Sequence, residues 1–517
     1  MRAVTEVPAS PARRRLAVCD LGSNSFRLVV FTAVDGWWRR TDEIYQPVRI
    51  GEGMAATGAL GAEPMKRALD TITVFSHFCA ASGLQPDEID AVATSAIRDA
   101  TNQATFLQRA RKKGGMDIRV LSREEEAHYG YLAAVNSTTL ADGAVLDIGG
   151  GSMQLVGVTG RHATDRASWP LGAVRMTERF LDHAGPATPK QLDRLRAHVA
   201  AELEAHPWIG RSGKRLVGVG GTVRNLAVAA QRMADMPAGG GVQGYAVERA
   251  CVDELVERVA ALPRSERGSV PGVKPARADV IVAGLTVIQS VMEIGGFPAI
   301  EATEAGLREG VFYSRFLEDR GDPPLFEDVR SASVLNLAAQ YGVEPAHTAH
   351  VATLALGLFD DLAAAGLHPG DPIERELLWA ASTLHDIGVA IDYDDHHKHT
   401  RYLILNAGLP GFSPREVAIV AQAARYHRKG SPDPGPLAHH FRAGDGRVLD
   451  RCAVLLRLAE DLERSRDQAV RSVGVRVDDE RVELTLDALE DVSVPRWAAQ
   501  RENPLFTRAF DRRLVVV

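Results

Sequence analysis

Residues 144–158 read Ala144-Val-Leu-Asp147-Ile-Gly149-Gly150-Gly151-Ser152-Met-Gln154-Leu-Val-Gly-Val158. An apolar run ends in one acidic residue, glycines and a serine follow, and a second apolar run leaves the turn. This pattern predicts two short strands joined by a tight loop. Glycines let the backbone approach a ligand and turn several N–H groups towards one point, and the preceding Asp can hold a cation. The loop is therefore either a phosphate-binding turn or an ordinary Gly-rich hairpin.

The same arrangement occurs near the start of the chain, in Leu16-Ala-Val-Cys-Asp20-Leu-Gly22-Ser23-Asn24-Ser25-Phe-Arg27-Leu-Val-Val-Phe31. The two Asp residues are separated by about one domain length, so each half is the size of a domain. A third Gly-rich turn lies at Leu216-Val-Gly218-Val-Gly220-Gly221-Thr222. This duplication favours phosphate binding. The predicted phosphate-binding residues are Gly22, Ser23, Asn24, Ser25, Gly149, Gly150, Gly151, Ser152, Gly220, Gly221 and Thr222, and the predicted Mg²⁺ ligands are Asp147 and Asp20.

The composition is that of a globular protein, because 45% of the 517 residues are apolar and 25% are charged. A net charge of −7 argues against nucleic-acid binding, so local fields must attract an anionic substrate. The four cysteines have no paired spacing, which predicts neither disulfides nor a zinc site and favours the cytoplasm. We expect no signal peptide in residues 1–15 and no membrane span.

Four short motifs occur in order along the chain. They are Asp20 to Phe26 (Asp-Leu-Gly-Ser-Asn-Ser-Phe), Thr94 to Ala100, Leu121 to Ala127, and Asp147 to Ser152. Together they resemble the exopolyphosphatase / guanosine pentaphosphate phosphohydrolase (Ppx/GppA) family. The similarity extends through Pro170 to Arg175 and Gly306 to Gly310.

The resemblance implies an α/β fold of two duplicated actin-like (ribonuclease H-like) lobes. The longer members add an all-α HD-like domain, and a small β-containing module is expected at the C-terminus. The predicted boundaries are 14–133 for lobe I, 134–318 for lobe II, 326–470 for the helical domain and 471–517 for the last module. The charged, Pro-bearing segment from Glu318 to Pro324 is the expected linker.

The resemblance also implies the chemistry. The catalytic Glu of the family directly precedes Ala in the third motif, which is Glu126 here, whereas Glu124 and Glu125 are expected to be capping or solvated groups at the start of the helix after Ser122. Arg98 follows the predicted strand Asp90 to Thr94, and its family position makes it a donor to substrate phosphate. The expected activity is that of an exopolyphosphatase, because the extra domain favours polyphosphate, and guanosine pentaphosphate is the alternative substrate. The implied cofactor is Mg²⁺ or Mn²⁺, and a homodimer is expected. For Lys274 and Arg277, contact with substrate and a position on the surface are equally compatible with the sequence.

Other elements follow from local patterns. Apolar spacing and caps predict a helix from Pro64 to Ser82, a polar loop from Arg161 to Arg166, a helix after Thr188, a helix from Val247 to Leu262, and a β-hairpin between Val473 and Asp487.

The segment from Phe326 to Leu462 is helical in pattern. It carries His350, the pair His385-Asp386 and Asp461 on three predicted helices. A His, a His-Asp pair and a distant Asp form the ligand set of HD-type metal phosphohydrolases, and imidazole with carboxylate suits a divalent cation. This resemblance fits an active second metal site as well as an inherited scaffold, and the scaffold is favoured.

Basic residues lie near these positions. We interpret them as a track that holds the distal part of a polyanion, although charge runs are usually solvated surface. The members are His397, Lys398, His399, Arg425, His427, Arg428 and Lys429.

One position departs from the better-known relatives, in which the central loop continues Ser-Thr-Glu. Here it continues Ser152-Met-Gln154. Gln keeps hydrogen-bonding capacity and loses the charge that a cation prefers, so metal affinity or choice is expected to differ. Three alternatives remain: a phosphotransferase of the actin-like superfamily, a non-catalytic sensor of polyphosphate or a guanosine alarmone, and an enzyme whose HD-like site is the active one.

Overall fold

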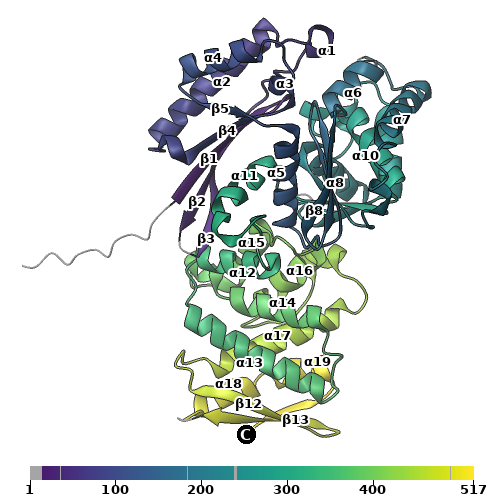
Figure 1. The fold of residues 1–517 in the computed structure, drawn as a ribbon. Helices are drawn as coiled ribbons and strands as arrows, with labels where there is room; N and C mark the ends of the chain where they lie inside the picture. The colour runs from purple at the N-terminus through teal and green to yellow at the C-terminus, as the bar shows by residue number, and fades with distance from the viewer. Residues whose placement is uncertain (1–13, 35, 183, 238–240, 489–490) are drawn as a thin grey trace, which may run out of the picture. The chain divides into compact units, whose positions relative to one another are not determined.

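The computed structural model describes residues 14–517 except 35, 183, 238–240 and 489–490. The first 13 residues, which contain most of the stretch expected to lack a signal peptide, lie outside the described residues. The chain divides into two compact units, 1–329 and 330–517 (Figure 1). We call them unit 1 and unit 2.

The first sheet of unit 1 has the strand order β3-β2-β1-β4-β5. Strand β1 pairs antiparallel with β2 and parallel with β4. Its members are β1 (Arg14–Leu21), β2 (Phe26–Val34), β3 (Trp37–Gln46), β4 (Ile89–Ala93) and β5 (Ile118–Val120). The helices that follow these strands are α1 (Met54–Thr57), α2 (Ala62–Ala81), η1 (Pro86–Glu88), α3 (Ser95–Arg98) and α4 (Gln103–Gly114). Figure 1 shows α2 and α4 together on one side of this sheet.

The second sheet has the order β10-β11-β9-β6-β7-β8. Read from β8 to β11, it repeats the first sheet: an antiparallel three-stranded run, then parallel neighbours. The predicted duplication is therefore confirmed. The strands are β6 (Gly143–Ile148), β7 (Met153–Thr159), β8 (His162–Trp169), β9 (Leu216–Val219), β10 (Tyr245–Glu248) and β11 (Ala299–Ala302).

The remaining helices of unit 1 follow β5 in the chain. They are α5 (Arg123–Val135), α6 (Ala173–Phe180), α7 (Pro189–Leu203), η2 (Ile209–Arg211), α8 (Gly220–Met233), α9 (Arg249–Ala260), η3 (Arg267–Ser269), η4 (Pro275–Arg277), α10 (Ile281–Gly295), α11 (Leu307–Phe316) and η5 (Glu318–Arg320). Figure 1 shows α5 and α11 between the two sheets. Among the described helices of the whole chain, none has both the length and the hydropathy that a bilayer crossing requires.

Two predictions of local structure need correction. The stretch Arg161 to Arg166 is mostly strand β8, because an edge strand tolerates polar residues on its exposed face, and exposed and partly buried positions alternate along it. The helix predicted from Val247 begins at Arg249, after the short strand β10. The helix α2, the strand β4 and the helix α7 agree with the prediction.

The segment expected to be a linker is tied to unit 1. The Asn136 side chain, at the end of α5, donates from Nδ2 to the Pro324 carbonyl at 3.0 Å. Its Oδ1 accepts from the Phe326 N–H at 2.9 Å. Both bonds are buried, so the chain remains anchored to α5 until just before unit 2 begins.

Unit 2 is a helical body with a small sheet. The predicted hairpin is confirmed as β12 and β13, and a third strand, β14, pairs parallel with β13. Apolar side chains of this sheet, such as Leu484 and Leu514, belong to the same core as the helices. The elements are α12 (Val329–Gln340), α13 (Pro345–Ala364), α14 (Pro372–Leu384), η6 (Ile387–Ala390), α15 (His396–Ala407), α16 (Pro414–Arg425), η7 (Gly435–His440), α17 (Asp445–Leu462), β12 (Val470–Val477), β13 (Arg481–Ala488), α18 (Ser493–Gln500), α19 (Asn503–Phe510) and β14 (Arg513–Val516).

Close packing of α11 on α5 yields a stability prediction. A Cβ added at Gly310 of α11 would lie 1.9 Å from the Tyr129 carbonyl oxygen of α5, so Gly310→Ala must separate the two helices. We expect a loss of about 1–3 kcal/mol of unfolding free energy, the usual cost of overpacking. The control is Gly210→Ala, where the nearest atom is 3.9 Å away and the change should stay within about 0.5 kcal/mol. Equal unfolding midpoints in denaturant would contradict this packing.

Candidate active site

The two duplicated loops face and touch each other. The loop at Gly22 to Ser25 joins β1 to β2, and the loop at Gly149 to Ser152 joins β6 to β7. A Cβ at Gly151 would lie 2.5 Å from Ser95 Oγ and 3.2 Å from Ser23 Oγ. A larger residue at position 151 would force these serine side chains to move, so the absence of a side chain allows the close approach. The structure thus brings together the predicted loops of both lobes.

Some of the predicted amide donors are already used. The Gly22 N–H donates to the Ser25 carbonyl at 3.2 Å, and the Gly149 N–H donates to the Ser152 carbonyl at 3.0 Å. These two amides hold the turns in shape, so the prediction that they bind phosphate needs correction. The third predicted turn is the start of helix α8, where Gly220 to Thr222 occupy the first helical positions. N–H groups in a first helical turn have no helical acceptor and favour an anion.

Glu126 points into this junction. Its helix α5 begins with a capping box, in which Ser122 Oγ accepts from the Glu125 N–H and the Glu125 carboxylate accepts from the Ser122 N–H. The capping role expected for Glu125 is confirmed, and Glu124 is exposed. Glu126 is only 7% exposed. Arg98 Nη1 donates to its Oε2 at 2.7 Å, and Ser152 Oγ donates to its Oε1 at 3.3 Å.

Arg98 is therefore positioned differently from the expectation. In this structure its guanidinium holds the Glu126 carboxylate and the Leu121 carbonyl, at 2.7 Å and 3.0 Å. Its Nε makes no hydrogen bond and lies 3.7 Å from Asp99 Oδ1. A role on substrate phosphate stays a prediction.

Three carboxylates near the junction are protonated more readily than usual. Burial raises the pKa of Glu126, although Arg98 and Ser152 oppose the shift. Burial, together with the charges of Glu126 and Asp20, raises the pKa of Asp147 to about 7. Burial also raises the pKa of Asp20, against the lowering effect of Arg308 and Arg27. Three mutually repelling acids in one buried place favour a bound cation.

The chemistry of the donors fits Mg²⁺ at Asp147. Asp147 and Gln154 are paired across β6 and β7. The Gln154 Nε2 donates to Ser152 Oγ at 3.0 Å and to Ser168 Oγ at 3.2 Å. Its Oε1 is buried with no hydrogen-bond partner, which leaves one amide oxygen beside one carboxylate for a hard cation. The residue paired with Asp20 is Arg27, so Asp20 fits an arginine partner better than a metal.

The charges of Arg27, Arg224 and Arg308 act on Asp20, and these three form a group with Arg277, which lies near Arg27 and Arg224. Burial lowers the pKa of Arg27, Arg224 and Arg277, and each also feels the charge of another member of the group. Arg308 is the fourth member, and its Nε is buried without a hydrogen-bond partner. They come from β2 (Arg27), α8 (Arg224), η4 (Arg277) and α11 (Arg308). Arg27 forms an ion pair with Glu43 at 3.1 Å, and the other three form none with any residue that the structure describes.

Arg277 lies against the first turn of α8. A Cβ at Gly221 would be 2.0 Å from Arg277 Nη2, so the guanidinium lies directly against the helix backbone and would have to move if the residue were larger. A guanidinium beside the positive end of a helix dipole is unfavourable on its own. An anion bound between the two would satisfy both. Of the two residues left open by the sequence, Lys274 is exposed and Arg277 belongs to this arginine group.

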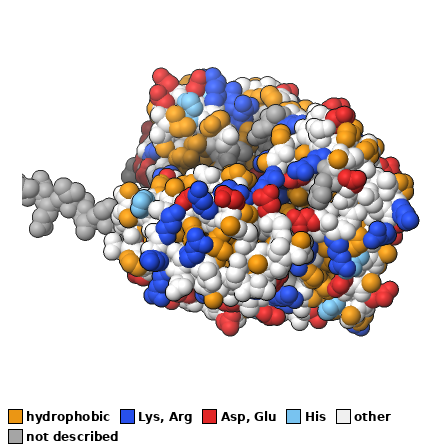
Figure 2. Space-filling model, turned by 90° about the horizontal axis from the view of Figure 1, so that it is seen from above, with side chains coloured by type: hydrophobic (Ala, Val, Ile, Leu, Met, Phe, Trp, Pro, Cys, Tyr) orange, Lys and Arg blue, Asp and Glu red, His pale blue; other side chains and the backbone are white. Residues whose placement is uncertain are grey.

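No sequence motif marked Arg27, Arg224 or Arg308 as a site residue. The repeat could have indicated Arg27, because it stands opposite Asp20 as Gln154 stands opposite Asp147. Figure 2 shows acidic and basic side chains mixed on the face seen from above, so the anion-attracting charge is local.

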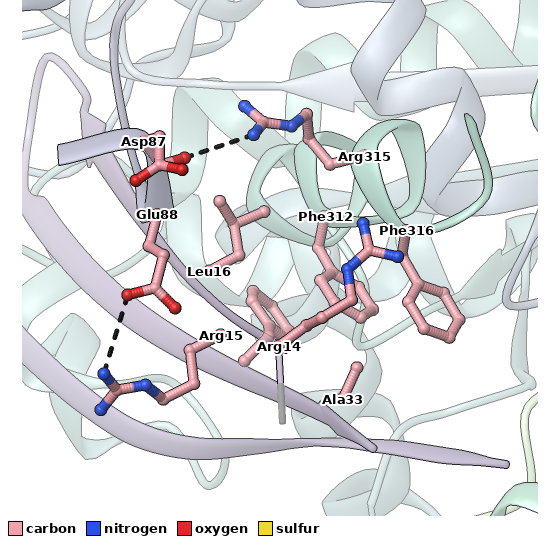
Figure 3. Close-up of a pocket in the computed structure, with 10 residues that line it drawn as sticks. Arg14, Arg15, Leu16, Ala33, Asp87, Glu88, Phe312, Arg315 and Phe316 are labelled. Atoms are coloured by element: carbon pink, nitrogen blue, oxygen red, sulfur yellow. Dashed lines mark hydrogen bonds and ion pairs between the residues drawn. The ribbon is translucent and has the colours of Figure 1, made fainter. Parts of the chain in front are cut away.

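A separate cavity of about 310 Å³ lies at the start of β1 (Figure 3). Phe31, Phe312 and Phe316 form its apolar part. Its charged side chains are paired: Arg15 lies 3.7 Å from Glu88, and Arg315 donates to the Asp87 carbonyl at 3.3 Å. This cavity has fewer uncommitted donors than the loop junction, so it is the weaker candidate for an anion.

In unit 2 the predicted ligand set needs correction at two positions. His385 and Asp386 lie together, but His350 turns its Nε2 to the Val470 carbonyl at 2.8 Å. His347, one helical turn earlier, lies with them instead. Asp461 faces the charges of Glu502 and Arg464, and burial with Glu502 raises its pKa to about 6. The neighbouring Glu460 is the carboxylate close to His347 and His385, at 3.2 Å from each.

The predicted polyanion track also needs correction. His397 and His427 are 1% and 2% exposed, so they cannot contact a polyanion on the surface. Lys398, Arg428 and Lys429 are exposed, while His399 and Arg425 are partly exposed. Lys398 and Lys429 already lie 2.5 Å and 4.0 Å from the Asp395 carboxylate. A track built from the exposed residues stays a prediction.

The fold and the loop junction define a phosphatase built on a duplicated actin-like scaffold, a hydrolase of phosphoanhydrides. The model of the Ppx/GppA phosphatase family matches residues 29–319, and the model of Ppx/GppA phosphatase domain III matches residues 329–507. The chain therefore belongs to the Ppx/GppA phosphatase family.

Solved structures agree. The chain is similar to the Ppx/GppA family member of Aquifex aeolicus, with 28% identity, a TM-score of 0.51, and coverage of 60% of this chain and 100% of that chain. It shares the fold of an exopolyphosphatase from Cytophaga hutchinsonii, with 24% identity, a TM-score of 0.54, and coverage of 58% and 97%.

The contact between Arg98 and Glu126 yields a pH prediction. A general base works only when deprotonated, so kcat/KM should fall as the pH falls through the raised pKa of Glu126. Arg98 lowers that pKa, so Arg98→Met should move the acidic limb of the profile to higher pH. The control Arg119→Met removes an exposed partner of Glu125 and should leave the limb in place. An unmoved limb in Arg98→Met would separate Glu126 from the pH dependence.

The neutral Gln154 yields a metal prediction. Gln154→Glu adds a charge beside Asp147, so half-maximal activity should require roughly tenfold less Mg²⁺, the effect of about 1.4 kcal/mol. The measurement is activity against Mg²⁺ concentration at fixed substrate. The control Gln243→Glu lies away from Asp147, where its amide contacts Ser137, Thr303 and Glu304. An unchanged or higher Mg²⁺ requirement in Gln154→Glu would argue against a metal at Asp147.

Proposed function

We propose that this phosphatase is an exopolyphosphatase that hydrolyses the terminal phosphoanhydride of inorganic polyphosphate and releases orthophosphate. The observation that carries the proposal is the buried Glu126 carboxylate, held by Arg98 and Ser152 where the two loops meet. Phosphoanhydride hydrolysis needs a positioned phosphoryl group, neutralised charge and a water aimed in line. The junction offers a group suited to each of these tasks.

Glu126 is the proposed general base. Burial raises its pKa towards neutrality, which makes it a stronger base than an exposed glutamate. The bond from Arg98 fixes Oε2, and the longer contact from Ser152 leaves Oε1 the freer oxygen to take the proton of the attacking water. Gln154 in turn fixes Ser152 through its Nε2. The carboxylate is thus oriented from both lobes.

Charge neutralisation falls to the backbone and the arginines. The first turn of α8 and the loop amides that remain after the turn bonds would contact the phosphoryl oxygens. Arg27, Arg224, Arg277 and Arg308 would hold the phosphates behind them, since a repeating polyanion can satisfy several guanidinium groups at once. Mg²⁺ at Asp147 and Gln154, when bound, would offset further charge on the phosphate oxygens.

One observation favours guanosine pentaphosphate as the alternative substrate. Tyr45 is 41% exposed, and the Arg27 guanidinium lies 4.9 Å from the centre of its ring. An exposed ring beside an arginine can stack on a planar base. Polyphosphate would gain nothing from such stacking.

The test of this function is Glu126→Gln. It should lower kcat by about 10²–10⁴, the usual worth of general-base assistance, with little change in KM. The measurement is orthophosphate release with Mg²⁺ from polyphosphates of several lengths and from guanosine pentaphosphate. The matched control Glu125→Gln removes only the capping carboxylate and should keep kcat.

The same assay decides between the proposals. A higher kcat/KM on polyphosphate supports the exopolyphosphatase, and a higher value on guanosine pentaphosphate supports the alternative. Substrate binding without turnover in the wild type would leave the non-catalytic sensor. Near-full turnover by Glu126→Gln would exclude Glu126 as the base.

A further inference from the structure

Unit 2 buries six ionisable side chains in one place, which we call the histidine cluster. They are His347 on α13, His385 and Asp386 at the end of α14, His396 at the start of α15, His427 after α16, and Glu460 on α17. The four histidines and Asp386 are at most 9% exposed. Burying so many polar groups is costly unless each finds a partner. The cluster therefore needs an explanation.

The ring protons of three of these histidines point away from the centre of the cluster. The Nδ1 atoms of His385, His396 and His427 lie 2.7 Å, 2.8 Å and 2.7 Å from backbone carbonyl oxygens. In each case the carbonyl belongs to the residue three positions earlier in the chain. A carbonyl only accepts, so each Nδ1 carries a proton. In a neutral ring the Nε2 is then a bare lone pair, the state in which imidazole binds a metal.

These lone pairs face one another. His396 Nε2 and His427 Nε2 are 3.1 Å apart, and with both protons on Nδ1 neither atom can donate to the other. His385 Nε2 is buried with no hydrogen-bond partner, and so are both ring nitrogens of His347. Glu460 Oε2, which faces His347 and His385, also lacks a bonded partner. Cations placed among these atoms would satisfy the four Nε2 lone pairs and Glu460 Oε2.

Distances divide the cluster into two sets that share Asp386. In the first set, Glu460 Oε2 lies 3.2 Å from the Nε2 of both His347 and His385, and Asp386 lies 4.0 Å and 3.7 Å from the same atoms. In the second set, Asp386 Oδ1 lies 3.4 Å from His396 Nε2 and 3.9 Å from His427 Nε2. Ligands at bond lengths near 2.1 Å stand about 3.0–3.4 Å apart, so small shifts close either set around an ion.

We propose that unit 2 holds a dinuclear centre of divalent transition-metal ions, with the Asp386 carboxylate bridging the two ions. His347, His385 and Glu460 complete the first site, and His396 and His427 complete the second. Imidazole with carboxylate suits Mn²⁺, Fe²⁺, Co²⁺ or Zn²⁺, whereas Mg²⁺ prefers oxygen alone. This centre is additional to the site at the loop junction of unit 1 and does not depend on the function proposed there.

Arg466 forms an ion pair with Asp386, the proposed bridging carboxylate. Its Nη2 donates to Asp386 Oδ2 at 2.7 Å, and its side chain is 43% exposed. A guanidinium in this place neutralises Asp386 when no ion is bound, and it would compete with an ion for Oδ2. Because the arginine side chain is half in solvent, it can move aside at little cost.

Metal stoichiometry tests the centre in the full-length chain. Protein loaded with Mn²⁺ and dialysed against metal-free buffer should retain about two ions per chain by mass spectrometry. His427→Gln should retain about one, and Asp386→Asn should lose both. The matched control His439→Gln changes an exposed histidine of η7 and should retain both. Wild-type protein that holds no more Mn²⁺ than Asp386→Asn would overturn the proposal.

Electron paramagnetic resonance of the Mn²⁺-loaded wild type tests the bridge without any variant. Exchange coupling between two ions supports a shared carboxylate, and uncoupled mononuclear signals would overturn the proposed bridge. This measurement needs only the wild type, so it remains decisive if Asp386→Asn does not fold. Glu126→Gln should keep the coupled signal while it loses phosphate release. Failure of the metal centre is therefore distinguishable from failure of the proposed function.

Discussion

The burial of one carboxylate organises the catalytic unit. A glutamate as enclosed as Glu126 is costly unless charge and hydrogen bonds compensate it. The compensation comes from both lobes, because Arg98 follows β4 of the first sheet and Ser152 follows β6 of the second. Helix α5 must therefore stand between the sheets, and its packing on α11 allows only glycine at position 310. The position of the Glu126 carboxylate and the joining of the lobes are one constraint.

Duplication supplies two equivalent strand ends, and one residue in each half gives them different chemistry. Asp20 and Asp147 end the corresponding strands β1 and β6. Across the hairpin, Asp20 faces Arg27 and Asp147 faces Gln154. The first half is thus part of an arginine group whose chemistry suits anions, and the second keeps oxygen donors suited to a cation. A single scaffold used twice provides both kinds of charge that a phosphoanhydride requires.

The sequence predicted the parts of this site that depend on local backbone. Glycine spacing predicted both loops, and the Ser122 to Glu125 cap predicted the start of α5. The sequence could not predict that the Gly22 and Gly149 N–H groups donate hydrogen bonds within their own turns, because these bonds depend on the loop geometry. The sequence also could not predict that Arg224 and Arg308 lie near Asp20, since α8 packs on the second sheet and α11 on β1, and only the folded chain brings both helices there.

In unit 2 the sequence predicted the ligand positions only to within one helical turn. His347 and His350 are three residues apart and occupy neighbouring positions on one helix face, so periodicity cannot choose between them. Glu460 and Asp461 are adjacent, and only the rotation of α17 decides which one faces the histidines. The pattern of residue types indicated a metal site in this region, and the three-dimensional arrangement selected its ligands.

The two proposed metal sites differ in donor chemistry, and this difference has a functional consequence. The loop junction offers oxygen ligands from Asp147 and Gln154, which suit Mg²⁺, whereas the histidine cluster offers mainly nitrogen ligands, which suit a transition metal. Ions of one class would exchange poorly into the site of the other. Activity measured with Mg²⁺ alone would then depend on the site at the loop junction. The metal occupancy of the histidine cluster would remain as it was after purification. The metal content of unit 2 is therefore a separate property of the chain, to be set before the chemistry of either site is compared between preparations.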